Sequence, residues 1–217
     1  FAHDIRLLAH LREVEEPFGE KQIGSSAMPY KRNPMRTERI TALSRHVLTL
    51  TLDAGFTAAT QWFERTLDDS ANRRIVLGEA YLATDAILLL VHNVAAGLVV
   101  RPAVIRRRLE EEMPFLATEA ILMHAVRRGG DRQDLHERIR QHSVAAADRL
   151  KEGAGENDLV DRIAGDDAFG LTRDEVREIL APERHTGRAS AQVDAYLAEL
   201  EPVLAEAEAG DAPELRA

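Results

Sequence analysis

Residues 71–98 read ANRRIVLGEAYLATDAILLLVHNVAAGL, a run without proline in which apolar residues fall on nearly every side of a helix. The three residues before it, Asp68-Asp69-Ser70, are types that start helices. A helix that is apolar nearly all round is typical of one surrounded by other helices. The most apolar stretch, residues 75–100, is interrupted by Glu79, Asp85, His92 and Asn93. Burying them in a bilayer would cost roughly several kcal/mol in total, so the sequence predicts a bundle helix and no membrane span.

Two more helices are predicted upstream of this run. Residues 1–15 carry apolar side chains at helical spacing, and a second such pattern runs from about residue 35 to residue 58. Glycine, serine and proline punctuate residues 17–34 between them, which predicts a long loop. Asn33 is a candidate N-cap and Pro34 a candidate first residue of the following helix. A second break is expected at residues 62–69. Three such helices without a strand pattern between them predict an all-α, long-helix bundle.

The character of the sequence changes at Arg101-Pro102, after which the helical segments become short and amphipathic. We therefore expect residues 1–100 to be the last part of a helical-bundle domain with a loop at 21–34. Residues 101–217 are expected to form a small C-terminal helical domain. Its predicted breaks lie at Pro114, Gly129-Gly130, Gly153 to Gly155, Gly165 to Gly170 and Pro182 to Gly187.

Composition narrows the possible functions. Hydrophobic residues make up 45% of the chain and aromatic residues 5%, and there is no cysteine, which excludes disulfides, zinc-thiolate sites and thiol catalysis. A formal charge of -9 argues against a nucleic-acid partner, because a phosphate backbone needs a basic surface. No secretory signal is recognisable, so we expect a cytoplasmic protein. Phe1 falls inside a predicted helix and not at an initiator methionine, so we expect a piece of a longer protein.

Residues 21–39 read KQIGSSAMPYKRNPMRTER and form the most distinctive stretch. They combine hydroxyls, an ammonium group, an amide and guanidinium groups with the free backbone N–H groups of a helix start. Such a set suits the binding of an anion and the stabilisation of charge that develops on it. An ordinary polar loop between helices would also explain these residue types, and the residue types alone leave both interpretations open.

The order of the residues favours the first interpretation. The pattern Gly-Ser-Ser-x-Met-Pro-x-Lys-x-Asn-Pro at residues 24–34 resembles the signature loop of the fumarase/aspartase superfamily. Within that superfamily, residues 30–39 resemble the adenylosuccinate lyase family. The resemblance continues at residues 62–74, WFERTLDDSANRR, and in the second half at residues 117–119 and 186–189, so it covers essentially the whole chain.

The resemblance implies an anti elimination that releases fumarate from adenylosuccinate, giving AMP, and from the succinylaminoimidazole-carboxamide ribotide of purine biosynthesis. Ser25 matches the family's base, which removes a proton beside a carboxylate. A serine needs cationic neighbours and backbone N–H groups to act as a base, and Lys31 fits that need. Asn33 is expected to hydrogen-bond a succinyl carboxylate. The resemblance implies neither a cofactor nor a metal.

Four more residues match family positions that bind the substrate's phosphate and carboxylates: Arg39, Arg65, Ser70 and Arg74. Guanidinium groups pair well with planar anions, although each arginine could instead form an ion pair within the protein. The family's general acid is a histidine from an upstream segment whose motif does not occur here. We therefore assign no acid, expect all eight histidines to be structural or exposed, and expect this chain alone to be inactive.

The resemblance also implies a homotetramer whose active sites draw residues from three subunits. Two alternatives remain. A sister enzyme, such as another superfamily lyase or a carboxymuconate cycloisomerase, is disfavoured by residues 30–39. A non-catalytic helical scaffold is disfavoured by the presence of Ser25, Lys31 and Asn33 together.

Overall fold

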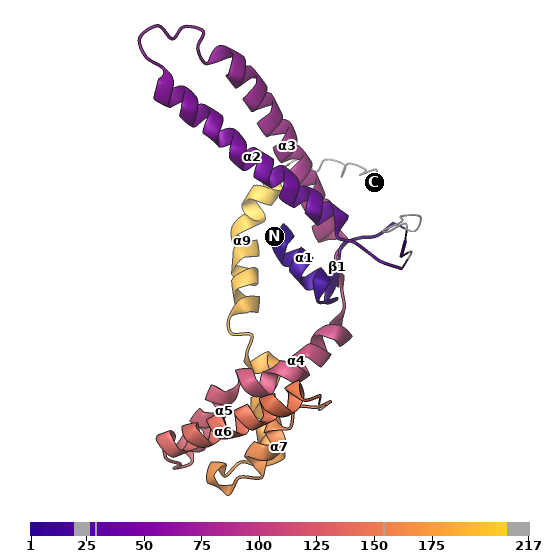
Figure 1. Ribbon diagram of the computed structural model, residues 1–217, viewed down its shortest axis with the longest axis vertical. Helices are drawn as coiled ribbons and strands as arrows, with labels where there is room; N and C mark the ends of the chain where they lie inside the picture. The colour runs from indigo at the N-terminus through magenta and orange to yellow at the C-terminus, as the bar shows by residue number, and fades with distance from the viewer. Residues whose placement is uncertain (20–26, 29, 154, 208–217) are drawn as a thin grey trace. The chain divides into compact units, whose positions relative to one another are not determined.

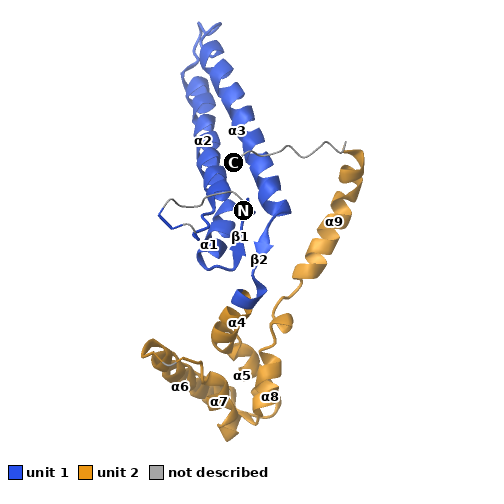
Figure 2. Ribbon diagram, turned by 90° about the vertical axis from the view of Figure 1, so that its right-hand side faces the viewer, with its two compact units in different colours: residues 1–104, 210–217 blue, residues 105–209 orange. Residues whose placement is uncertain are grey.

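The computed structural model describes residues 1–19, 27–28, 30–153 and 155–207. The chain divides into two compact units (Figure 2), of which the first covers Phe1–Val104 and the second begins at Ile105. Over the described residues both units are built of helices, with one two-stranded sheet in the first unit. The predicted all-α fold is confirmed.

Unit 1 is a long antiparallel helical hairpin with a short helix at its base (Figure 1). The hairpin consists of α2, Met35–Thr60, and α3, Ser70–Ala96, which pack side by side and match the two long helices predicted from the sequence. Helix α1, Ala2–His10, packs against α2 near its start. Strands β1, Val14–Glu15, and β2, Val99–Val100, pair antiparallel.

The first helix is shorter than predicted. The sequence predicted helix over residues 1–15, but α1 ends at His10 and the chain turns through Arg12, whose φ is 61°. Val14 then enters the core as part of β1, and the carbonyl of Glu13 accepts a hydrogen bond from the backbone N–H of Arg101. Pairing with a segment far along the chain therefore overrides the local helical pattern.

The predicted cap of α2 is also wrong. Pro34 and not Asn33 precedes the first helical residue, and no cap hydrogen bond comes from that position. Glu16, from the segment before the loop, supplies the acceptor atoms instead. At α3 the predicted start is confirmed within one residue, since the helix begins at Ser70, but Asp69, which precedes it, forms no side-chain cap hydrogen bond.

Burial in the hairpin is confined to its base. Six residues form this core: Ala2, Ile5, Val14, Ile40, Leu90 and Val94. No residue between 42 and 89 is buried, and large apolar side chains there are open to solvent, among them Phe56, Tyr81 and Leu82. By length and composition α3 could cross a membrane, with a mean hydropathy of 1.6 over its most apolar window, 11% of which is buried. Within the described residues of unit 1, the helix predicted to be surrounded thus has α2 as its main neighbour over most of its length.

Unit 2 has its own core, in which Ile121, Leu135, Leu159, Phe169 and Val176 are fully buried. The predicted break at Pro114 is wrong, because Pro114 lies inside α4, which ends two residues later. The other predicted breaks fall between helices. The elements are α4, Pro102–Leu116, α5, Thr118–Arg127, α6, Arg132–Lys151, α7, Leu159–Ala164, η1, Asp167–Phe169, α8, Arg173–Ile179, η2, Pro182–Arg184, and α9, Ala189–Glu206.

Candidate active site

Lys31 and Asn33 lie at the base of the hairpin, on the extended segment that leads into α2. The backbone N–H of Lys31 donates to the carbonyl of Met28 at 2.9 Å, which turns the chain just before this segment. Lys31 is exposed and Asn33 is half-buried. Ser25, the predicted base, lies outside the described residues, as do Gly24, Ser26 and Pro29.

A cavity of about 670 Å³ opens between this segment and α1. Its walls hold five side chains that are or can become cationic, and one acidic side chain, Glu38. The five are His3, Arg6, His10, Lys31 and Arg32. In a chain with a formal charge of -9, this local excess of positive charge favours an anionic ligand.

The α1 side of this cavity was not predicted from the sequence. His3, Arg6 and His10 are three to seven residues apart, so they share one face of α1. That spacing is visible in the sequence, but nothing there shows that this face meets the loop. Among the described residues, the Arg6 side chain has no ion-pair or hydrogen-bond partner.

The side chain of Glu15 contacts the segment that carries Lys31. The Glu15 carboxylate pairs with the guanidinium groups of Arg32 at 2.9 Å and Arg101 at 2.8 Å. These hydrogen bonds, that of Arg101 foremost, lower the pKa of Glu15 below its usual value. Arg32 also lies over the ring of Phe18, with its central carbon 5.4 Å from the ring centre.

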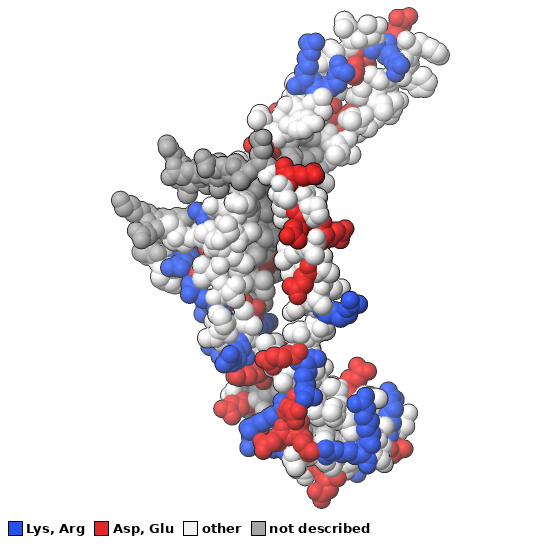
Figure 3. Space-filling model, turned by 180° about the vertical axis from the view of Figure 1, so that it is seen from behind, with Lys and Arg blue, Asp and Glu red and all other residues white. Residues whose placement is uncertain are grey.

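The second predicted group, Arg65, Ser70 and Arg74, lies where α2 and α3 are joined. Both arginines are exposed and Ser70 is half-buried in the first turn of α3. Within the part of the chain that the structure describes, neither these arginine side chains nor that of Arg39 forms an ion pair. Arginine side chains lie at this end of the hairpin beside acidic ones, whereas much of the visible surface along its length is uncharged (Figure 3).

The side chain of Asn72 connects α3 to α2 at this junction. Its side-chain NH₂ donates to the carboxylate of Asp53 at 2.7 Å and to the hydroxyl of Thr57 at 2.6 Å, both on α2. Its side-chain oxygen is buried and unpaired among the described residues. The contacts fix the start of α3 against the end of α2, so they also fix where Ser70 and Arg74 lie.

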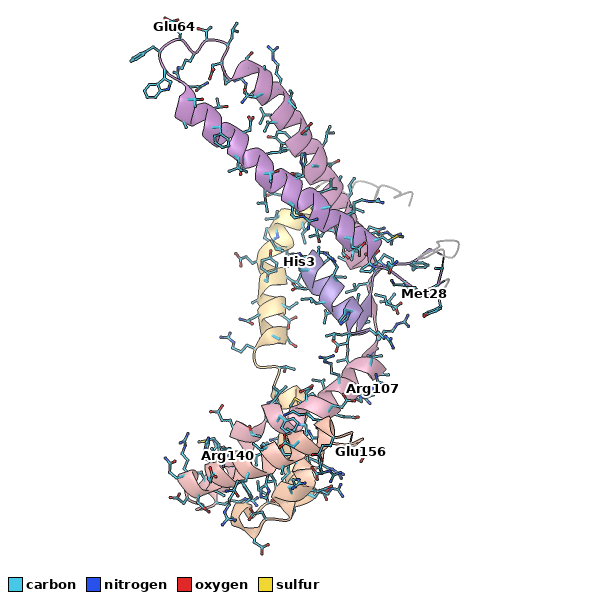
Figure 4. All side chains as sticks on the ribbon, in the orientation of Figure 1. His3, Met28, Glu64, Arg107, Arg140 and Glu156 are labelled. Atoms are coloured by element: carbon cyan, nitrogen blue, oxygen red, sulfur yellow. The ribbon has the colours of Figure 1, made fainter. Side chains whose placement is uncertain are left out.

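The two groups do not meet within one chain. Helix α2 alone has 26 residues, and at a rise of about 1.5 Å each it separates them by roughly 39 Å. Figure 4 shows the two ends, with His3 and Met28 near the base and Glu64 in the far loop. Arg39, in the second turn of α2, lies with the first group and not with the other predicted phosphate ligands.

Known proteins resemble this chain in both sequence and fold. A family described as lyase matches residues 1–49, and a family described as adenylosuccinate lyase C-terminus matches residues 114–196. Among solved structures, 3-carboxy-cis,cis-muconate lactonizing enzyme from Pseudomonas putida superposes with a TM-score of 0.75 at 25% identity, over 93% of this chain and 44% of that one. These matches, together with the helical hairpin, place the chain in the fumarase/aspartase superfamily.

Sequence relatives narrow this class. Adenylosuccinate lyase from Saccharomyces cerevisiae is 53% identical over 196 residues, or 90% of this chain and 41% of the relative. The enzyme from Schizosaccharomyces pombe is 48% identical over the same shares, and that from Schistosoma mansoni 47% over 93% and 42%. The chain belongs to the adenylosuccinate lyase family and corresponds to its C-terminal portion. It spans about two fifths of the length of the relatives it matches.

Proposed function

We propose that the whole protein containing this chain eliminates fumarate from adenylosuccinate, giving AMP, and from the succinylaminoimidazole-carboxamide ribotide of purine biosynthesis. The observation that carries the proposal is the 53% identity to an adenylosuccinate lyase, maintained over 90% of the chain. The 25% identity to the lactonizing enzyme is much weaker, so we prefer the lyase reaction to cycloisomerisation.

In the proposed mechanism, Ser25 takes a proton from the succinyl CH₂ carbon, which lies between a carboxylate and the carbon that bears the departing nitrogen. The electron pair left behind spreads into the adjacent carboxylate, and the carbon–nitrogen bond then breaks to give fumarate. Lys31 and Asn33 serve this succinyl end, where negative charge grows, and the cationic cavity beside them supports that role. The nitrogen receives its proton from a histidine outside this chain, so we expect this chain alone to have no turnover.

Arg65, Ser70 and Arg74 are proposed to bind the phosphate of the substrate. Ser70 lies in the first turn of α3, with Arg65 in the loop before it and Arg74 in the second turn. This arrangement supports the role, because free backbone N–H groups and the helix dipole favour an anion at a helix start. The absence of ion pairs for both arginines, within the described residues, leaves their guanidinium groups available for a phosphate.

One substrate cannot reach both groups of a single chain across roughly 39 Å of helix. We therefore propose that each active site combines the loop group of one copy with the arginine group of another, in a homotetramer. The apolar, unburied length of the hairpin supports this assembly, since packing hairpins together would cover it. Glu79 and Asp85 in the middle of α3 argue for a protein partner and against lipid.

The test is fumarate release by the whole protein, with Ser25→Ala as the diagnostic variant. Ser25→Ala should lose turnover on the order of a thousandfold or more while still binding adenylosuccinate, as expected when the proton-abstracting group is removed. Turnover within about tenfold of the unsubstituted protein would show that Ser25 is not the base. A protein that cyclises a carboxymuconate, or that converts neither substrate, would refute the proposal.

A further inference from the structure

The loop that carries Ser25, Lys31 and Asn33 begins after Glu16 and ends at the start of α2. We propose that Glu15 and Glu16 form a clamp that closes this loop at its base and thereby positions Lys31 and Asn33. The inference rests on the proposed function, and it assigns to the two glutamates a positioning role without contact to the substrate.

Glu16 makes the central contacts of the clamp. It is only 5% exposed, and its two carboxylate oxygens accept hydrogen bonds from the backbone N–H groups of Arg36 at 2.9 Å and of Thr37 at 3.0 Å. The Thr37 hydroxyl adds a third contact at 3.3 Å. A carboxylate buried at a helix N-terminus is stabilised by these free N–H groups and by the helix dipole. The start of α2 is therefore capped by a residue from the other side of the loop.

Three further contacts hold the two ends of the loop. The Arg36 guanidinium donates to the carbonyl of Pro17, the first residue of the loop. Pro17 also lies against Gly97 at the end of α3, where an added Cβ would come within 2.7 Å of the Pro17 ring. Glu15, fixed by the pairing of β1 with β2, holds Arg32 at 2.9 Å. Both ends of the loop are thus bound to the base of the hairpin.

These contacts lie directly beside the residues proposed to handle the succinyl end. Arg32 separates Lys31 from Asn33, and only Pro34 and Met35 separate Asn33 from the capped residue Arg36. Lys31 and Asn33 can keep a fixed position beside α1 only if this short segment is held. A displacement of about 1 Å in such groups can cost roughly a hundredfold in rate. Neither glutamate lines the cavity, which separates their role from that of Lys31.

A cap that merely stabilises the fold would show the same hydrogen bonds, so a matched control is needed. Asp131 provides it, because one of its carboxylate oxygens accepts from the backbone N–H groups of Gln133 and Asp134, both at 2.9 Å. It caps α6, which belongs to unit 2, whereas the loop belongs to unit 1. Asp131→Ala therefore removes a cap of the same chemistry and leaves the clamp intact.

The experiment compares Glu16→Gln with Asp131→Ala in the whole protein, measuring the thermal midpoint, kcat, KM and inhibition by AMP. Glutamine keeps the size of Glu16 but replaces one carboxylate oxygen by an NH₂ group. That NH₂ group would face the backbone N–H of Arg36 or Thr37, and two donors cannot form a hydrogen bond. Both variants should lower the thermal midpoint. Only Glu16→Gln should lower kcat, by about ten- to a hundredfold, with the AMP inhibition constant within about twofold because the phosphate end is untouched. Glu15→Gln should lower kcat in the same direction.

Amide hydrogen exchange makes the clamp testable independently of catalysis. Exchange at Arg36 and Thr37 should be faster in Glu16→Gln, on the order of tenfold, and unchanged in Asp131→Ala. Unchanged exchange at these amides, or a kcat within twofold despite faster exchange, would overturn the inference. If the unsubstituted protein releases no fumarate, the proposed function fails and the exchange result alone decides whether the clamp exists.

Discussion

Two inactive variants of the whole protein should restore each other's activity when their subunits are mixed. The first is Lys31→Met, which disables the loop group, and the second combines Arg65→Ala with Arg74→Ala, which disables the far end. Since α2 keeps these groups roughly 39 Å apart, each site must draw them from different copies. When equal amounts of the two variants exchange subunits at random, half of the sites receive an intact loop group and, independently, half receive an intact arginine group. About one quarter of the sites then hold both groups, so about one quarter of the original activity should return.

The assay follows fumarate release at a substrate concentration well below KM, after incubation under conditions that let subunits exchange. A second mixture, Lys31→Met with Ser25→Ala, is the matched control, because both substitutions disable the same loop and no hybrid site can be intact. It should stay inactive. Activity of the first mixture no greater than the sum of its parents, with subunit exchange demonstrated by mass, would refute the shared-site geometry.

Arg65→Ala or Arg74→Ala should raise KM for adenylosuccinate while leaving KM for a dephosphorylated analogue nearly unchanged; equal penalties for both compounds would assign these arginines to protein structure or to a carboxylate. Arg6→Gln should raise the fumarate inhibition constant by about ten- to a hundredfold, as for the loss of a charged hydrogen bond, and an unchanged constant would place the dicarboxylate outside the cavity. Arg128 and the cap of α8 lower the pKa of Glu175 from 4.5 to about 2, so its contribution to folding is complete above pH 4.5 and is lost as the pH falls towards 2. Glu175→Gln should flatten the decline of the thermal midpoint over that range.

Local patterns in the sequence were enough to predict the long helices. The apolar spacing of residues 35–58 and the helix-starting residues 68–70 act within a few turns, so their effect is visible without knowing the fold. The end of α1 was not predictable in this way, because it depends on the pairing of Val14 and Glu15 with Val99 and Val100. The sequence gives no local sign of a contact between segments so far apart.

The residues of the candidate site also differ in whether the local sequence predicts them. The order of residues in the signature loop predicts Lys31 and Asn33 as site residues, and both line the cavity beside α1. The capping of α2 by Glu16 was missed, because Asn33 is the better local candidate and Glu16 reaches α2 from across the loop. The α1 wall of the cavity was missed for the same reason: the position of Arg6 becomes meaningful only once α1 packs beside the Lys31 segment.

In the proposed homotetramer, the lack of any fully buried residue between positions 42 and 89 makes folding of this protein depend on its concentration. A hairpin whose side chains are at most partly buried along most of its length gains less free energy of folding from its own chain. In such an assembly the remaining stability comes from the other copies, so folding and association form one equilibrium governed by mass action. Dilution should then melt the far half of α2 and α3 in the same step that separates the subunits. Newly made chains expose this apolar surface until they associate. During that interval, correct assembly competes with aggregation.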